Sequence, residues 1–148
     1  MSEIFLGLKD PHVLSYSRHY HYWKKRLMIG KLFKDKAMFG RAHIEVLDIG
    51  CGAGTESFYL NSLYSDLKDK AVYTGIDLSA DNIKHCNAAK DTGGMLNMRF
   101  FTGDIARLDF KDEVFDAAVC SEVLEHLPDQ AAAIAEIRRV LKTGGMLI

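Results

Sequence analysis

The chain has 148 residues, 48% of them hydrophobic and 26% charged, which is typical of one soluble globular domain and unlike a disordered chain. No apolar run approaches the roughly 20 residues that cross a bilayer, and the start of the chain lacks a signal-peptide pattern, so we expect a cytoplasmic protein without a transmembrane segment. The net charge is −1, but residues 1–44 carry nine Lys/Arg against three Asp/Glu, whereas residues 45–148 carry ten against seventeen.

The basic first segment, residues 1–43, is expected to be helical. Tyr16, Tyr20, Trp23 and Leu27 recur at intervals of three and four residues, which predicts one apolar stripe on a helix. The stripe has two interpretations. It either packs on the rest of the protein or forms a lid over a ligand, since mobile terminal segments often close binding sites.

From residue 44 onward, β-like runs alternate with helical patterns, and we treat residues 44–148 as one core domain. The predicted strands are 44–49, 71–76, 98–101 and 115–120, with a fifth at 146–148 after a turn at 143–145. The predicted helices are 56–67, 80–91 after a Ser79 cap, and a third from an Asp129 cap to Lys142. This alternation predicts an α/β fold with an open, mostly parallel, doubly wound sheet.

A glycine-rich segment follows the first predicted strand. Gly50, Gly52 and Gly54 would bring unshielded backbone amides close to a ligand, although the same glycines would also suit a tight strand-to-helix turn. Asp48 just before them would repel a pyrophosphate and attract an ammonium or sulfonium group. The dinucleotide fingerprint would also need a glycine where Thr55 stands, so both features argue against NAD.

Two more aspartates follow the next strands. Asp77 ends the second strand, where a carboxylate can accept two hydrogen bonds from a ribose diol; alternatively, it caps the following helix. Asp104 follows the third strand and could accept from an adenine amino group while the Ile105 amide donates to the ring. An ordinary turn aspartate is the other interpretation of Asp104.

These segments together resemble the class I, Rossmann-like S-adenosylmethionine-dependent methyltransferases of the methyltransferase-11/25-like group. The resemblance covers about residues 44–148 and rests on four motifs in order, with 141–145 similar to the family's turn into strand five. Those motifs are Val46-Leu47-Asp48-Ile49-Gly50-Cys51-Gly52-Ala53-Gly54, Gly75-Ile76-Asp77-Leu78-Ser79, Gly103-Asp104-Ile105, and the segment from Phe115 to Asp129. The family sheet has seven strands, so the resemblance implies that strands six and seven are missing and that the chain is a fragment.

The resemblance also implies which residues hold S-adenosylmethionine and its product S-adenosylhomocysteine. The glycine loop would lie along the methionine part, Asp48 near its ammonium group, Asp77 on the ribose hydroxyls, Leu78 on the adenine, and Ser121 beside the cofactor. The full set of implied cofactor-binding residues is Asp48, Gly50, Cys51, Gly52, Gly54, Asp77, Leu78, Asp104, Ile105 and Ser121.

The expected reaction is in-line displacement of the sulfonium methyl by an O, N or C nucleophile, with positioning as the enzyme's main contribution. If the acceptor must lose a proton, His126 and Glu122 are candidate bases, although His126 also suits a structural role. Glu122, Glu125 and His126 would share one helical face and resemble the Glu-x-x-Glu-His metal ligands of small-RNA 3′-terminal 2′-O-methyltransferases. A solvated first helical turn is the simpler interpretation, and we predict no metal.

Three functions remain open. The first is a methyltransferase for a small metabolite or lipid-like acceptor, and the second, suggested by the basic aromatic front, is an RNA methyltransferase. The third is a binding or scaffold module without catalysis.

The three widely spaced cysteines, Cys51, Cys86 and Cys120, are expected to be reduced thiols. An exposed edge on the fifth strand would favour pairing with another chain.

Overall fold

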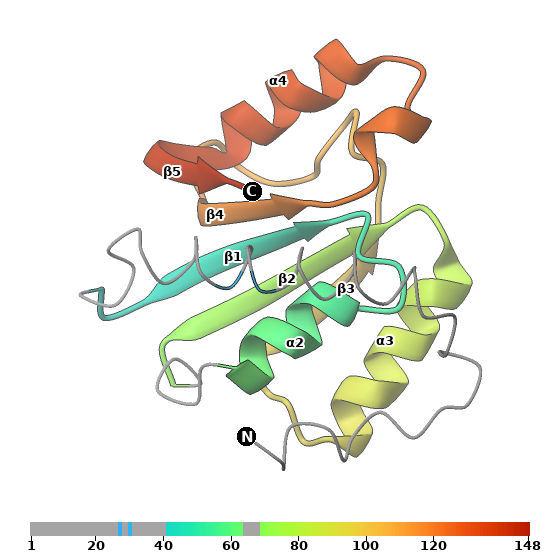
Figure 1. Ribbon diagram of the computed structural model, residues 1–148, viewed down its shortest axis with the longest axis vertical. Helices are drawn as coiled ribbons and strands as arrows, with labels where there is room; N and C mark the ends of the chain where they lie inside the picture. Colours follow the sequence, from blue (N-terminus) through green and yellow to red (C-terminus); the bar gives the residue numbers. More distant parts are fainter. Residues whose placement is uncertain (1–26, 28–29, 31–40, 64–68) are drawn as a thin grey trace.

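A computed structural model of the protein describes residues 27, 30, 41–63 and 69–148. Its centre is a five-stranded parallel sheet with the strand order β3-β2-β1-β4-β5 (Figure 1). The strands are β1 (Ile44–Ile49), β2 (Ala71–Asp77), β3 (Met98–Thr102), β4 (Phe115–Cys120) and β5 (Leu141–Leu147). The strand order reverses direction between β1 and β4, and ligands of open parallel sheets bind beyond the carboxyl ends of the strands at such a point.

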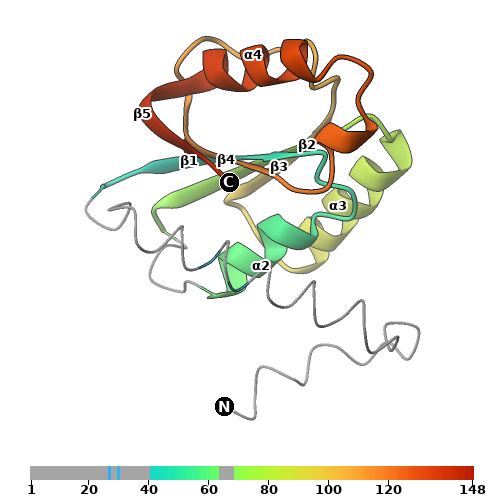
Figure 2. The same ribbon diagram turned by 45° about the horizontal axis from the view of Figure 1, so that its top comes forward.

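Helices cover both faces of the sheet. Figure 2 shows α2 (Thr55–Leu63) and α3 (Ala80–Thr92) on one face and α4 (Gln130–Val140) on the other. Ser79 and Asp129 cap α3 and α4 as predicted, because their side chains accept from the amides of Asn82 and Ala132. The predicted doubly wound α/β fold is confirmed.

The core consists of two clusters, one on each face of the sheet. Val46 and Leu47 are neighbours in β1 and both are fully buried, but Val46 belongs to the cluster under α2 and α3 and Leu47 to the cluster under α4. Successive side chains of a strand point to opposite faces. The four apolar residues of β1, which point to both faces, are therefore what a strand buried on both faces requires.

The boundary between α4 and β5 differs from the prediction. The helix ends at Val140 and not at Lys142, because Leu141 already has extended backbone and pairs with Phe115 of β4. The predicted turn at 143–145 is instead a bulge within β5. Phe115 pairs with Leu141 and Ala117 with Met146, so four residues of β5 lie opposite Asp116 alone.

Two further predictions, for the end of the first helix and for the basic segment, concern residues that the structure does not describe. The end of the helix predicted to reach residue 67 and nearly all of the basic segment 1–43 lie outside the described residues. Within the part that is described, no helix is long and apolar enough to span a membrane.

Candidate functional site

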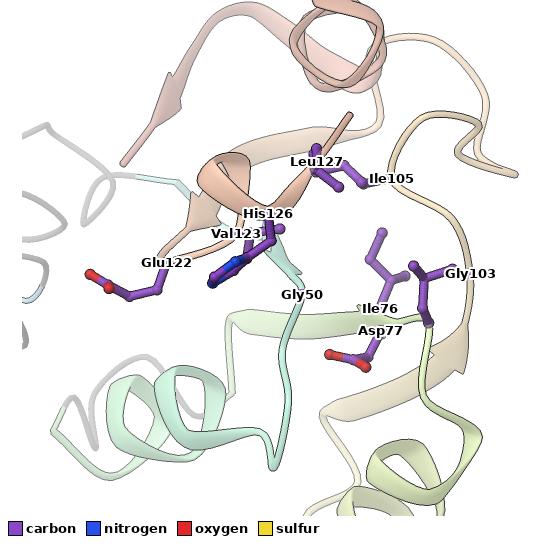
Figure 3. A pocket seen from close by; sticks show the side chains of 10 residues that line it. Gly50, Ile76, Asp77, Gly103, Ile105, Glu122, Val123, His126 and Leu127 are labelled. Carbon is purple, nitrogen blue, oxygen red and sulfur yellow. The ribbon is translucent and has the colours of Figure 1, made fainter. Parts of the chain in front are cut away.

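A cavity of about 260 Å³ opens at the carboxyl edge of the sheet (Figure 3). Its walls come from the segments that follow β1, β2, β3 and β4, which meet here because all four strands are parallel. The lining residues are Gly50, Ile76, Asp77, Leu78, Gly103, Ile105, Glu122, Val123, His126 and Leu127. Of the predicted site residues, the structure thus brings Gly50, Asp77, Leu78, Ile105, Glu122 and His126 to one cavity.

The loop after β1 turns sharply through its three glycines, which have φ values of +61°, +52° and +76° at Gly50, Gly52 and Gly54. A Cβ atom at Gly50 would lie 2.4 Å from Val123 Cγ2, and one at Gly54 would lie 2.6 Å from the Phe58 ring. At Gly52 it would meet nothing within 4 Å. Gly50 and Gly54 are therefore required by packing, whereas at Gly52 only the left-handed backbone favours glycine.

Asp77 connects the glycine loop after β1 with the start of α3. Its Oδ2 accepts from the Gly52 amide at 2.9 Å, and its Oδ1 accepts from the Ser79 amide at 2.8 Å. The side-chain amide of Asn82 donates to the same Oδ1 at 3.2 Å. The carboxylate therefore binds the start of α3, as the capping interpretation predicts, and it also lines the cavity.

Asp48 lies behind the glycine loop and does not line the cavity. It is 4% exposed, and its Oδ2 accepts from the Ser57 amide at 3.1 Å and from the Ser57 hydroxyl at 2.6 Å. Burial raises the pKa of Asp48 to about 7, against the opposing effect of the Ser57 hydrogen bonds. Asp48 therefore holds its proton to a higher pH than an ordinary aspartate, which weakens the negative charge that its sequence position suggested.

The predicted adenine and strand-four residues have different surroundings. Asp104 is exposed, and its Oδ1 accepts from the Ala106 amide within its own turn. Ile105 is buried and lines the cavity. Ser121, at the end of β4, has a buried hydroxyl without a hydrogen-bond partner among the described residues.

The three residues considered as metal ligands do not share a helical face. Only Leu124–His126 form a short 3-10 turn, and Glu122 lies before it with a φ of +59°. The expected i, i+3, i+4 geometry is wrong because a left-handed residue cannot belong to a right-handed helical turn. Within residues 41–63 and 69–148 no group of three His, Cys, Asp or Glu is placed to hold a metal ion.

The three cysteines are free thiols, as predicted. Cys86 approaches the Gly52 carbonyl oxygen at 3.3 Å, and the Cys51 sulfur lies 3.9 Å from the same atom. Burial raises the pKa of both thiols, and that of Cys120 rises to about 11. All three are therefore protonated packing groups at neutral pH.

The donor and acceptor set fits S-adenosylmethionine. Asp77 places a carboxylate on the wall for a diol, and Leu78 is 68% exposed beside it, which suits an aromatic base. The buried, unpaired Ser121 hydroxyl comes directly before Glu122, which lines the cavity. Sequence reasoning missed Ile76, Gly103, Val123 and Leu127 as lining residues, because a glycine or an apolar residue near a strand end has no sequence signal that separates a lining position from a turn or core position.

Comparisons with known proteins show the family and the fold. A family profile described as "Methyltransferase domain" matches residues 47–148. The demethylmenaquinone methyltransferase of Staphylococcus aureus strain MRSA252 is 32% identical over 136 residues, covering 92% of this chain and 51% of the relative. The chain therefore spans about half the length of the curated relatives that it matches.

Solved structures share the fold. The YcgJ protein of Bacillus subtilis has a TM-score of 0.67 and 29% identity, covering 80% of this chain and 48% of its own. The [4+2]-cyclase SpnF has the same TM-score at 28% identity, covering 81% and 42%. A putative S-adenosylmethionine-dependent methyltransferase from Methanococcus maripaludis, with a TM-score of 0.68 and 22% identity, covers 80% and 52% and supports the fold. The chain belongs to the methyltransferase-domain family and has a Rossmann-like fold.

Proposed function

We propose that this chain binds S-adenosylmethionine at the carboxyl edge of its sheet and takes part in methyl transfer to a small, lipid-like acceptor. The observation that carries the proposal is that Asp77, Gly50 of the glycine loop and the segment after β4 line one cavity. Free thiols in the core agree with the expected cytoplasmic location, which remains part of the proposal.

In this proposal each part of the cofactor is bound by residues in or beside the cavity. Asp77 accepts from the ribose hydroxyls, Leu78 packs on the adenine, and Ile105 with Asp104 contacts the adenine edge. The loop of Gly50, Cys51, Gly52 and Gly54 follows the methionine part. Asp48 acts from behind that loop through water, and Ser121 supplies its unpaired hydroxyl.

The acceptor would enter from the side of the segment after β4. When bound, the cofactor supplies a methyl group activated by its sulfonium leaving group. Figure 3 shows that Glu122 and His126 come from this segment, and both are exposed. Among the described residues, Glu122 and Glu113 are the non-glycine residues with a left-handed φ, and of the two only Glu122 lines this cavity. Glu122 or His126 would take the acceptor's proton, which makes them the proposed catalytic residues.

Two observations favour a quinone-like acceptor. From the same segment as Glu122 and His126, the apolar side chains of Val123 and Leu127 also line the cavity. Such a surface suits a flat apolar ring with a polar oxygen at one edge. In addition, the curated relative is named for its action on demethylmenaquinone.

The cofactor proposal is tested by calorimetry with S-adenosylhomocysteine. We expect the wild-type chain to bind it and Asp77→Ala to weaken binding at least about tenfold, because hydrogen bonds to a charged group are lost. Asp91→Ala is the matched control: this aspartate lies on α3 but outside the cavity, and its ion pair is with the neighbouring Lys90. Absence of binding by the folded wild type, or equal affinity in Asp77→Ala, would contradict the proposal.

The same proteins then distinguish the three functions. Transfer of labelled methyl to demethylmenaquinone supports the quinone-like acceptor, whereas transfer to RNA favours the alternative that the basic residues 1–44 suggest. Cofactor binding without transfer to either, or to extracted cell metabolites, favours a scaffold.

A further inference from the structure

Asp77 already has three hydrogen-bond donors. The backbone amides of Gly52 and Ser79 donate to it at 2.9 and 2.8 Å, and the Asn82 side chain donates at 3.2 Å. The nitrogen of the Asn82 amide must face Asp77, because a carboxylate offers only acceptors. Asn82 is the one side-chain donor to Asp77 among the residues that the structure describes.

A ribose diol needs more free acceptor positions on the Asp77 carboxylate than the three donors leave. A carboxylate has about four lone-pair positions, so three donors leave one for two ribose hydroxyls. One donor therefore has to move. The Gly52 amide is fixed by the loop, which is closed by the Gly54 amide donating to the Cys51 carbonyl at 2.7 Å. The Ser79 amide is fixed at the cap of α3.

The Asn82 side chain is the donor that can rotate without moving the backbone. The Asn82 backbone amide donates to Ser79 Oγ at 3.2 Å, so the residue stays in the first turn of α3 while its side chain turns. A ribose hydroxyl that donates to Asp77 keeps lone pairs with which it can accept from an amide. The Asn82 amide can thus exchange the carboxylate for the hydroxyl oxygen.

We propose that Asn82 is a ribose-binding residue, which holds Asp77 in the free protein and donates to a ribose hydroxyl once the cofactor is bound. The inference rests on the proposed function, since it presupposes a ribose in this cavity. It assigns recognition of the diol to a pair, Asp77 as acceptor and Asn82 as donor.

The test compares S-adenosylhomocysteine with its 2′,3′-dideoxy form by calorimetry. We expect Asn82→Ala to weaken binding of S-adenosylhomocysteine by roughly 5- to 30-fold, the effect of one or two lost hydrogen bonds. Binding of the dideoxy form should change by less than about twofold, because it has no hydroxyl to contact Asn82. Asn82→Asp, with a similar size but no donor, should lose at least as much affinity for S-adenosylhomocysteine.

Asn87→Ala is the matched control. This asparagine lies on the same helix, but its side chain donates to the Phe100 carbonyl at 3.3 Å, whereas that of Asn82 donates to Asp77. Equal losses for both ligands in Asn82→Ala would mean that Asn82 only supports the loop, and an unchanged affinity would mean that it does not reach the ribose; either result overturns the inference. Failure of the wild type to bind S-adenosylhomocysteine would overturn the proposed function itself.

Discussion

The charge of Asp48 differs in the folded chain from what its position in the sequence suggests. By sequence it is a carboxylate before a glycine loop, suited to attract a positive group. In the fold, its burial behind that loop raises its pKa from 3.8 to about 7. Ser57, nine residues later, supplies both of its hydrogen bonds. Its charge therefore depends on pH within the physiological range.

The stability of the protein should reflect this shift. Between about pH 4 and 7 the folded Asp48 binds a proton that the unfolded chain releases, so its contribution lowers the free energy of unfolding as pH rises through this window. We expect this decline to reach at most about 4 kcal/mol and to be absent in Asp48→Asn. Urea unfolding of both proteins from pH 4 to 8 measures the difference. A constant difference across that range would contradict the raised pKa.

At the scale of elements, the site depends on close contact between the glycine loop after β1 and the segment after β4. Gly50 has a φ of +61°, and a Cβ there would lie 2.4 Å from Val123 Cγ2. Neither requirement is visible in the glycine pattern alone, because Val123 lies on a separate segment. The loop after β1 can pack this closely on the segment after β4 only because Gly50 has no Cβ atom.

This contact gives a paired prediction. Gly94 has the same φ of +61°, but a Cβ there would meet nothing within 4 Å. Gly94→Ala should thus cost only the left-handed backbone penalty of about 1–2 kcal/mol, and Gly50→Ala roughly a further 1–3 kcal/mol from overpacking. Denaturant unfolding measures both. Equal losses in the two variants would show that Val123 moves aside at no cost.

The end of α4 shows a limit of local pattern. Leucine and lysine are good helix formers, so nothing in residues 141–142 stops a helix. Yet Leu141 pairs with Phe115 of β4, and the strand starts there. The Leu141 amide still donates to the Ile137 carbonyl, so helix and strand meet without an intervening loop. Pairing with a distant strand thus outweighs a local propensity of a few tenths of a kcal/mol.

At the scale of the whole molecule, a buried carboxylate joins three parts of the chain. Asp116 in β4 accepts from the Glu45 amide of β1 at 2.9 Å and from Lys142 of β5 at 2.9 Å, and it also pairs with Arg41. Burial alone would raise its pKa, but the Glu45 amide and the two cations together lower it below 3.8. Asp116 is therefore charged at neutral pH and links β1, β4 and β5.

Removal of this link should lower global stability. Asp116→Ala leaves the Glu45 amide and both cations without their acceptor, and we expect a loss of about 2 kcal/mol at pH 7. Asp116→Asn keeps an acceptor for the amide and should lose less. Because the folded pKa is depressed, the wild-type advantage over Asp116→Asn exists above about pH 4 and should shrink as pH falls below it. An advantage that persists undiminished in acid, measured by urea unfolding, would exclude the charge as its source.

The fold by itself does not fix the reaction. Among the solved structures that share it, one is named a [4+2]-cyclase, at 28% identity. The functional argument accordingly rests on the residues around the cavity and on the binding experiments with Asp77 and Asn82.

The sequence alone determined the elements and their order. Apolar runs predicted β1 to β4, Ser79 and Asp129 predicted two helix starts, and the parallel alternation predicted the sheet edge at which Gly50, Asp77 and Ile105 meet. These features depend on neighbouring residues, which is why pattern is enough for them.

The tertiary structure decided what depends on residues far apart in the chain. It set the start of β5 through pairing with β4, the left-handed backbone of Glu122, and the pKa of Asp48 through burial. It also joined Asp77 to Gly52 and Asn82, which makes Asn82 a candidate for ribose recognition. Strand pairing, desolvation and hydrogen-bond competition arise only once the segments are packed together, so no local pattern could have revealed them.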